Sequence, residues 1–145
     1  PDKTKKIYEL GILPHSKDVA MMKKVQWPAG VTLIHPRRKP SIVANHIKQC
    51  KAIASSSLHG LIFADSFRIP NIHLKMSDKL KGGFHKFNDY YQGMEMQYEY
   101  VNWESSLSKE NIISACKLRC ENEYLIEKQE KVIALMKHVL LKISQ

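Results

Sequence analysis

The stretch that most constrains the fold is 52–74, AIASSSLHGLIFADSFRIPNIHL, because it holds the patterns of two strands and a helix in twenty-three residues. Short apolar runs at 52–54 and 71–74 are typical of buried strands, and Pro70 stands where a missing N–H costs little. Between them, apolar residues recur at helical spacing from Leu58 onward. The stretch therefore predicts one βαβ unit of a parallel sheet.

Three serines and a histidine stand at the strand-to-helix turn of this unit. Ser55, Ser56 and Ser57 are residue types that cap helices, and the first N–H groups of a helix have no intrahelical partner. With the helix dipole they predict an anion site at the strand's carboxyl end. His59 falls in the first helical turn, facing that anion, and Gly60 allows close approach of backbone or ligand.

The rest of the chain alternates between strand and helix patterns. The expected elements are strands at 5–13 and 31–34 and helices at 18–25 and 41–50, the helices opening on Ser16 and Ser41. The alternation predicts an α/β fold, a Rossmann-like parallel sheet of four or more strands with flanking helices. Such a fold places His15, the Arg37 loop and 55–59 at one sheet edge, where open α/β sheets bind ligands.

Beyond residue 74 the pattern changes. We expect a mobile loop at 76–83, a short helix at 86–94, an edge strand at 97–103, and a long helical stretch capped by Ser108 with a break at 119–123. Residues 1–107 are predicted to form the Rossmann-like donor-binding domain, and 108–145 a helical segment that packs on it.

The 52–74 stretch also carries a family resemblance. Its motif SSSLHGLIFADSFRIP resembles the signature of the polysaccharide pyruvyl transferase family, I-S-S-x-L-H-G-x-x-x-A-x-x-x-x-I-P. Three more segments resemble family motifs in the expected order: GILPHSKD at 11–18, IHPRR at 34–38 and FNDYY at 87–91. The resemblance implies a GT-B-like enzyme with two Rossmann-like domains facing across a cleft. With Pro as its first residue, the chain is expected to be the carboxyl-terminal half, inactive without the N-terminal domain.

The charge distribution limits which classes of binding partner we expect. Residues 1–51 hold eleven Lys and Arg against three Asp and Glu, and the remainder is nearly balanced. Such an excess suits nucleic acid, a membrane surface or an acidic substrate. No RNP, zinc-finger or helix-turn-helix pattern accompanies it, so we expect no nucleic acid. An anionic small molecule, or an anionic lipid-linked glycan at the membrane face, fits better.

Other sequence features bear on location and metal chemistry. The chain has no apolar run of membrane-spanning length, and its first residues lack a signal peptide's apolar centre. We therefore expect a cytoplasmic protein, brought to the inner face of the membrane if its acceptor is lipid-linked. Cys50, Cys116 and Cys120 form neither a disulfide framework nor a paired metal motif, so structural thiols and no metal site are predicted.

The resemblance implies that His59 binds the phosphoenolpyruvate donor, and we take it as the catalytic residue. A protonated imidazole beside unpaired N–H groups would hold phosphate or carboxylate and protonate the departing phosphate or enol. The predicted donor-binding residues are Ser56, Ser57, Leu58, His59, Gly60, His15, Arg37 and Arg38. Turn capping by His15 and a merely solvated arginine loop stay open. The side chains expected to be structural are Asp65, His73, His138, Asp89 and Tyr90, the last two packing against the signature helix.

The expected function is transfer of a pyruvyl group, as a ketal, from phosphoenolpyruvate to a sugar of a surface or capsular polysaccharide or its lipid-linked precursor. No cofactor is needed beyond the donor. Two alternatives stay open: a GT-B-type glycosyltransferase, since a diphosphate binds at the same helix terminus, and a non-catalytic polysaccharide-assembly scaffold. A serine hydrolase is excluded because Ser57-Leu58-His59 is not G-x-S-x-G, and neighbouring helix residues do not face each other.

Overall fold

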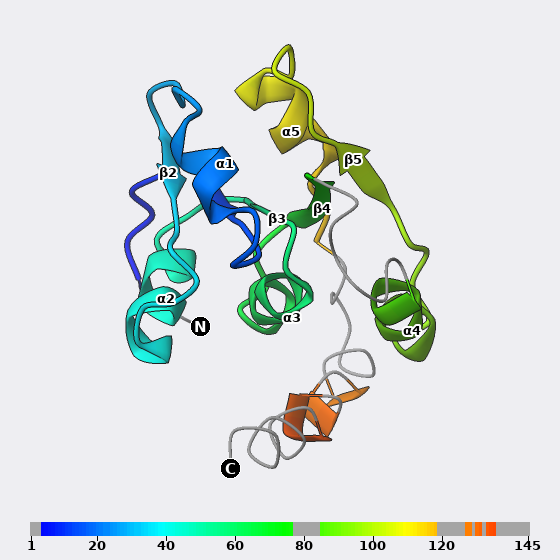
Figure 1. The fold of residues 1–145 in the computed structure, drawn as a ribbon. Coiled ribbons are helices and arrows are strands. Elements are labelled where there is room, and N and C mark those ends of the chain that lie inside the picture. Colours follow the sequence, from blue (N-terminus) through cyan, green and yellow to red (C-terminus); the bar gives the residue numbers. More distant parts are fainter. Residues whose placement is uncertain (1–3, 77–84, 119–126, 129, 132, 136–145) are drawn as a thin grey trace.

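The computed structural model of the chain describes residues 4–76, 85–118, 127–128, 130–131 and 133–135. Within these residues, five strands pair side by side, all parallel, in the order β2-β1-β3-β4-β5 (Figure 1). They are β1 (Leu10–Leu13), β2 (Val31–Leu33), β3 (Ile53–Ser55), β4 (Asn71–Lys75) and β5 (Tyr100–Asn102). The predicted α/β fold with a parallel sheet is confirmed.

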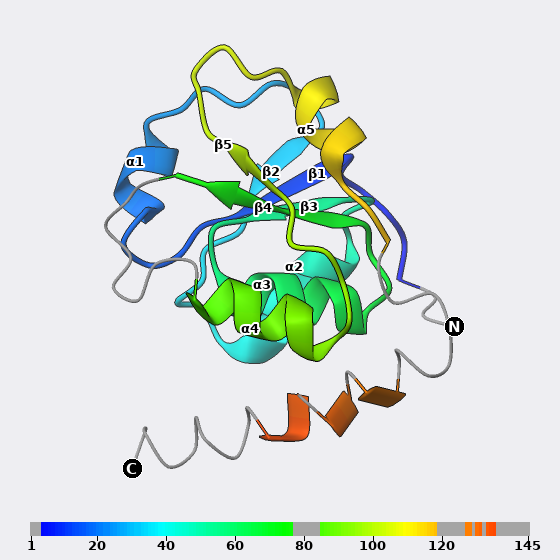
Figure 2. The same cartoon turned by 90° about the vertical axis from the view of Figure 1, so that its right-hand side faces the viewer.

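Helices cover both faces of the sheet, as Figure 2 shows. One face carries α1 (Val19–Lys23) and α5 (Lys109–Ala115), and the other carries α2 (Pro40–Lys48), α3 (Leu58–Ser66) and α4 (His85–Gly93). Successive strand residues alternate between these layers. Leu10 and Ile12 pack with α1 and α5, whereas Leu13 packs with α2 and α3. Because both faces are covered, β1 and β3 are buried along their whole length.

Several element limits differ from the prediction. The first strand begins at Leu10 rather than at residue 5, since Tyr8 forms only an isolated bridge with Cys50. The first helix is limited to α1, and its N-cap is Asp18, not Ser16. The second helix begins at Pro40, whose fixed φ and missing N–H suit the first helical position.

The helix predicted from Ser108 begins as expected and ends early. The Ser108 hydroxyl accepts a hydrogen bond from the Asn111 N–H at 3.1 Å, which is an N-cap. The helix stops at Ala115, because Cys116 is extended and Lys117 forms an antiparallel bridge with Asn71. The predictions for the 119–123 break, for Cys120 and His138, and for most of the 76–83 loop fall outside the described residues.

Two buried polar clusters join the outer helices to the core. Asp65 on α3 is fully buried and accepts hydrogen bonds from the Tyr90 hydroxyl of α4 at 2.8 Å and the Asn71 amide at 2.6 Å. Buried His73 stacks on Phe87 with 3.8 Å between ring centroids. The structural roles expected for Asp65, Tyr90 and His73 are confirmed. Asp89 is exposed, so its predicted packing on the signature helix is wrong.

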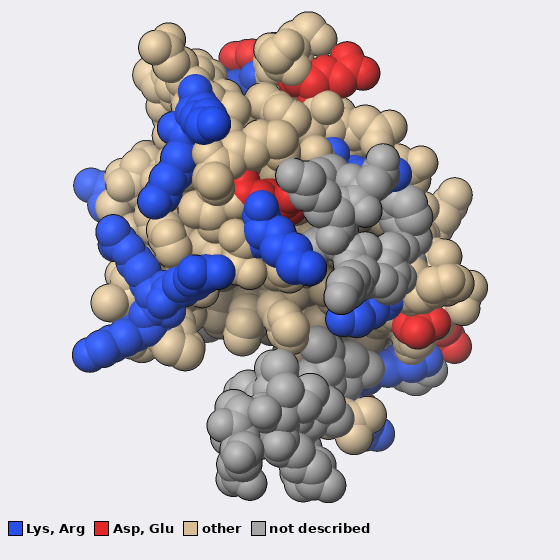
Figure 3. Space-filling model, in the orientation of Figure 1, with Lys and Arg blue, Asp and Glu red and all other residues tan. Residues whose placement is uncertain are grey.

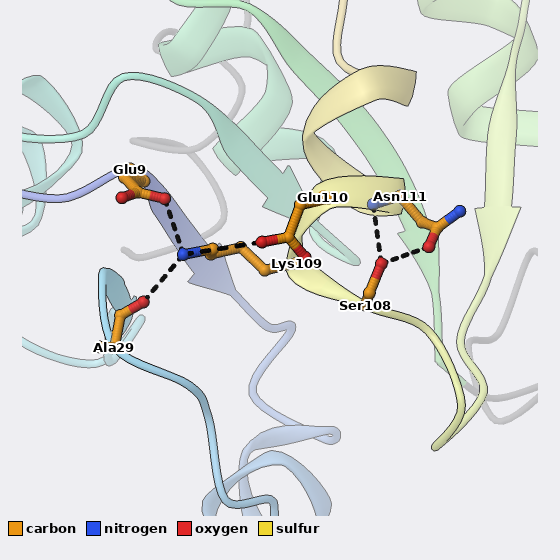
Figure 4. A network of polar contacts seen from close by, with 6 residues as sticks. All are labelled: Glu9, Ala29, Ser108, Lys109, Glu110 and Asn111. Atoms are coloured by element: carbon orange, nitrogen blue, oxygen red, sulfur yellow. Dashed lines mark hydrogen bonds and ion pairs between the residues drawn. The ribbon is translucent and has the colours of Figure 1, made fainter.

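A network of polar contacts joins the start of α5 to the segments that precede β1 and β2 (Figure 4). The Lys109 ammonium lies 2.8 Å from a Glu9 carboxylate oxygen and donates to the Ala29 carbonyl at 3.1 Å. The contact with Lys109 lowers the pKa of Glu9.

Cys50 is a buried thiol in the core of the fold. Burial raises its pKa to about 12, as expected for a structural cysteine. No helix in the described part of the chain is long and apolar enough to cross a membrane.

Candidate functional site

A cavity of about 460 Å³ opens at the carboxyl end of the strands, beside α2 and α3. Three segments line it: the turn after β1, the loop after β2 with the start of α2, and the first turns of α3. The lining residues are Leu13, His15, Ser16, Pro36, Arg37, Arg38, Pro40, Val43, Ala44, Ser57, His59, Gly60 and Phe63. The sheet order places β1 beside both β2 and β3, and ligands of doubly wound sheets bind at this switch point. The predicted gathering of His15, the Arg37 loop and the serine turn at one edge is confirmed.

Six of the eight predicted donor residues line the cavity, and Ser56 and Leu58 do not. Ser56 is 1% exposed, and its hydroxyl accepts the His15 N–H and donates to Asp18, each at 2.8 Å. Leu58 packs against the apolar cluster between α3 and α4. Both side chains are engaged within the protein, and the part of these two residues in donor binding stays a prediction.

The serine hydroxyls bond within the turn rather than to the first N–H groups of α3. Ser57 is the N-cap of α3 but makes no side-chain cap bond. Ser55 instead accepts the Ser57 N–H at 3.0 Å and donates to the Leu13 carbonyl at 2.7 Å. The predicted N-cap position is confirmed at Ser57, without the side-chain hydrogen bond that a capping serine usually makes. His59 and Gly60 in the first turn of α3 line the cavity, where a helix N-terminus favours an anion.

Gly60 is explained by close packing of the helix on the sheet. A Cβ at this position would lie 2.5 Å from the Ser55 hydroxyl oxygen and 2.6 Å from a Leu13 methyl carbon. The close approach predicted from the sequence is thus an approach of α3 to β1 and β3. It brings the first turn of the helix to the cavity wall, where Gly60 also lies.

His59 lies in the first turn of α3, as predicted, and is exposed on one side. The surrounding protein atoms lower the pKa of its imidazole by desolvation, and Lys86 and His15 lower it further. These effects favour the neutral ring when no anion is bound, and the protonated imidazole expected beside a bound anion stays a prediction. An anion in the cavity would oppose these effects and favour the protonated ring.

His15 follows β1 and is half-buried in the cavity wall. Its Nδ1 accepts the Lys17 N–H at 3.1 Å, so in the neutral ring the proton sits on Nε2. Burial lowers the pKa of His15, Asp18 raises it, and Lys17 and Lys86 lower it. His15 thus offers a ligand a hydrogen-bond donor at Nε2.

The arginine loop after β2 repeats this arrangement. The Nδ1 of His35 accepts the Arg37 N–H at 3.2 Å, just as His15 accepts that of Lys17. Arg37 and Arg38 are exposed at the cavity, and within the described part of the chain neither side chain has an ion-pair partner. Figure 3 shows Lys and Arg side chains spread around α1 and α2 on this face. The backbone of the loop is therefore held by His35, while the guanidinium groups of Arg37 and Arg38 are exposed at the cavity.

One cation near the site was missed by sequence reasoning. Lys86, at the start of α4, lowers the pKa of both His15 and His59, so its charge acts on both rings. Its only sequence signal is its place directly before the FNDYY segment. The described residues contain no group of three or more His, Cys, Asp or Glu side chains suited to a metal ion.

Comparisons with known proteins agree with this geometry. A family model described as polysaccharide pyruvyl transferase matches residues 3–78, which include every residue lining the cavity. "Uncharacterized protein L143" of Acanthamoeba polyphaga mimivirus is 33% identical over 111 residues, 73% of this chain and 39% of that protein. "Succinoglycan biosynthesis protein ExoV" of Rhizobium meliloti (strain 1021) is 32% identical over 100 residues, 65% of this chain and 30% of that protein. The chain spans well under half the length of these relatives, and no solved structure matches it significantly.

Proposed function

Because the chain belongs to the polysaccharide pyruvyl transferase family, we propose that it forms the donor-binding part of an enzyme that transfers a pyruvyl group from phosphoenolpyruvate to a polysaccharide sugar. The observation that carries the proposal is the cavity in which two histidines and two arginines meet at the start of α3. The name of the ExoV relative, a protein of succinoglycan biosynthesis, supports a polysaccharide or its lipid-linked precursor as the acceptor.

The charges of the cavity suit the donor. Phosphoenolpyruvate carries a phosphate and a carboxylate, and a guanidinium group binds either with two parallel hydrogen bonds. Arg37 and Arg38 supply two such groups, and the N-terminus of α3 supplies backbone N–H groups for the other anion. The apolar part of the wall, including Val43 and Phe63, limits water around the enol carbon.

The reaction requires protons at two positions. Two sugar hydroxyls bond to the enol carbon, the methylene becomes a methyl group, and the C–O bond to phosphate breaks. Of the two hydroxyl protons released, one balances the methyl group and the other the departing phosphate. His59 is assigned to protonate the phosphate, because anion binding would give its neutral ring a proton to donate.

The acceptor side of the site is assigned to the rest of the protein. We propose a GT-B-like enzyme in which a second Rossmann-like domain faces this cavity and provides the base and the sugar contacts. The chain covers 39% and 30% of its two relatives, which leaves length for such a domain. On this proposal the enzyme works in the cytoplasm, and the isolated chain binds donor without turning it over.

The test is calorimetric titration of the full-length enzyme with phosphoenolpyruvate and with nucleotide sugars. His59→Ala should weaken phosphoenolpyruvate binding by about 1.5 to 3 kcal/mol, the usual contribution of a charge-assisted hydrogen bond, and lower turnover further. His46→Ala is the matched control, since His46 bonds to Thr32 at 2.9 Å and does not line the cavity.

The outcomes separate the candidate functions. Donor affinity and turnover of His59→Ala within twofold of wild type would make the histidine structural. Preference for a nucleotide sugar would favour a glycosyltransferase, and binding of neither ligand would favour a polysaccharide-assembly scaffold.

A further inference from the structure

A closed ring of hydrogen bonds joins the turn after β1 to the serine turn after β3. The His15 N–H donates to the Ser56 hydroxyl at 2.8 Å, and that hydroxyl donates to Asp18 Oδ2 at 2.8 Å. The Asp18 N–H donates to the His15 carbonyl, also at 2.8 Å. Ser56 is 1% exposed and Asp18 2%, so water does not compete for these bonds. The ring links residues about forty positions apart in the sequence.

The position of Asp18 is better explained by this ring than by helix capping. Asp18 is the N-cap of α1, yet its side chain makes no cap hydrogen bond. An aspartate at this position normally accepts from the helix it precedes. Its carboxylate instead accepts from Ser56 and fixes the direction of that hydroxyl, which leaves the Ser56 lone pair toward His15.

The same turn determines which nitrogen of His15 carries the proton. The Lys17 N–H occupies Nδ1, so the neutral ring is protonated at Nε2. A ring in this state donates at Nε2 and cannot remove a proton from a sugar hydroxyl with that atom. His15 is therefore suited to contact the anionic donor and unsuited to be the missing base.

We propose that Asp18 is a positioning residue for His15: acting through Ser56, its buried carboxylate holds the turn so that His15 presents its Nε2–H to the donor anion. The inference rests on the proposed function, because it takes the cavity as the donor site. On this proposal Asp18 acts without touching the ligand, and Ser56 connects its carboxylate to the His15 backbone.

The charged neighbours of His15 define a second readout. Asp18 on its own turn raises the pKa of His15, while Lys17 on that turn and Lys86 on α4 lower it, and His15 in turn affects His59 on α3. Asp18→Asn keeps an oxygen that can accept from Ser56 but removes the charge. The titration midpoint of His15 should then fall while its tautomer is retained, a result that a purely structural role does not require.

The experiment uses the chain labelled with ¹⁵N-histidine, with NMR shifts reporting the tautomer and the titration of His15, and sulfate as the anion because it does not titrate in this range. Wild type should show the Nε2–H form. Ser56→Ala should lose that uniform tautomer and bind sulfate about three- to tenfold more weakly, as expected for one lost hydrogen bond to the turn. Tyr90→Phe is the matched control, since it loses a 2.8 Å hydroxyl bond to another buried carboxylate, that of Asp65, outside the cavity.

Two results would overturn the proposal. One is an Nδ1–H tautomer of His15 in wild type. The other is an equal effect of Ser56→Ala and Tyr90→Phe on sulfate affinity, which would reduce the ring to a stability element. If Ser56→Ala does not fold, the wild-type tautomer and the Asp18→Asn midpoint still decide. These measurements need no phosphoenolpyruvate, so the failure of the ring is distinguishable from the failure of the donor assignment.

Discussion

Replacing Gly60 with alanine tests how tightly α3 is seated on the sheet. The new methyl group would lie 2.5 Å from the Ser55 hydroxyl oxygen and 2.6 Å from a Leu13 methyl carbon. Ser55 cannot move away freely, because its hydroxyl bonds to the Leu13 carbonyl at 2.7 Å and to the Ser57 N–H at 3.0 Å. Either these bonds break or the first turn of α3 lifts from the sheet.

The expected magnitude follows from two opposing terms. Overpacking a buried site costs about 1 to 3 kcal/mol, and each hydrogen bond lost from Ser55 adds roughly 0.5 to 1.5 kcal/mol. Alanine is favoured over glycine in a helix by about 1 kcal/mol, which offsets part of that cost. We expect Gly60→Ala to lower the free energy of unfolding by about 1 to 3 kcal/mol.

Chemical denaturation followed by circular dichroism measures this change. Gly93→Ala is the matched control, because it is also a helical glycine but a Cβ there meets no atom within 4 Å. The control should be neutral or slightly stabilising, as helix propensity predicts. If Gly60→Ala is as stable as wild type, the close seating of α3 does not hold, and the positions assigned to Ser57 and His59 lose their basis.

Two further predictions concern the histidines and Lys86. Unfolded histidine titrates near pH 6.5. The pKa values of His15, His46 and His59 are lowered in the folded chain, so the unfolded state binds more protons. Stability should be full above about pH 6.5 and fall as the pH drops below it, and a pH-independent midpoint in thermal melts would contradict this. Lys86→Met should raise the pKa of His15 and His59 and weaken sulfate binding, measured by NMR titration against Lys51→Met; unchanged histidine midpoints would exclude Lys86 from the site.

The location of the site could be predicted from the sequence because it depends on topology. Strand and helix patterns that alternate require parallel strands, and parallel strands bring their carboxyl ends to one edge. His15, Arg37 and His59 each follow a strand pattern, so their meeting did not depend on side-chain detail. The errors in strand and helix limits left this edge unchanged.

The internal contacts of the site could not be predicted, because they depend on register. Ser56 meets Asp18 and His15 only because β1 and β3 pair with Leu13 beside Ser55. A capping propensity describes a serine beside its own helix and contains nothing about a strand thirty-eight or more positions away. The influence of Lys86 has the same origin, since it depends on how α4 packs against α3.

The lowered pKa values of the cavity histidines bear on how the proposed enzyme would supply its proton. Partial burial and Lys86 lower the pKa of His59, which disfavours an imidazolium beside the exposed arginines of the cavity. A donor with two anionic groups, entering between Arg37, Arg38 and the start of α3, would oppose these effects and raise the pKa values of the histidines. Donor binding would then draw a proton from solvent onto His59 before chemistry begins. An imidazole that is charged only beside the phosphate can release its proton as the phosphate leaves, because the charge that stabilised it departs at the same step.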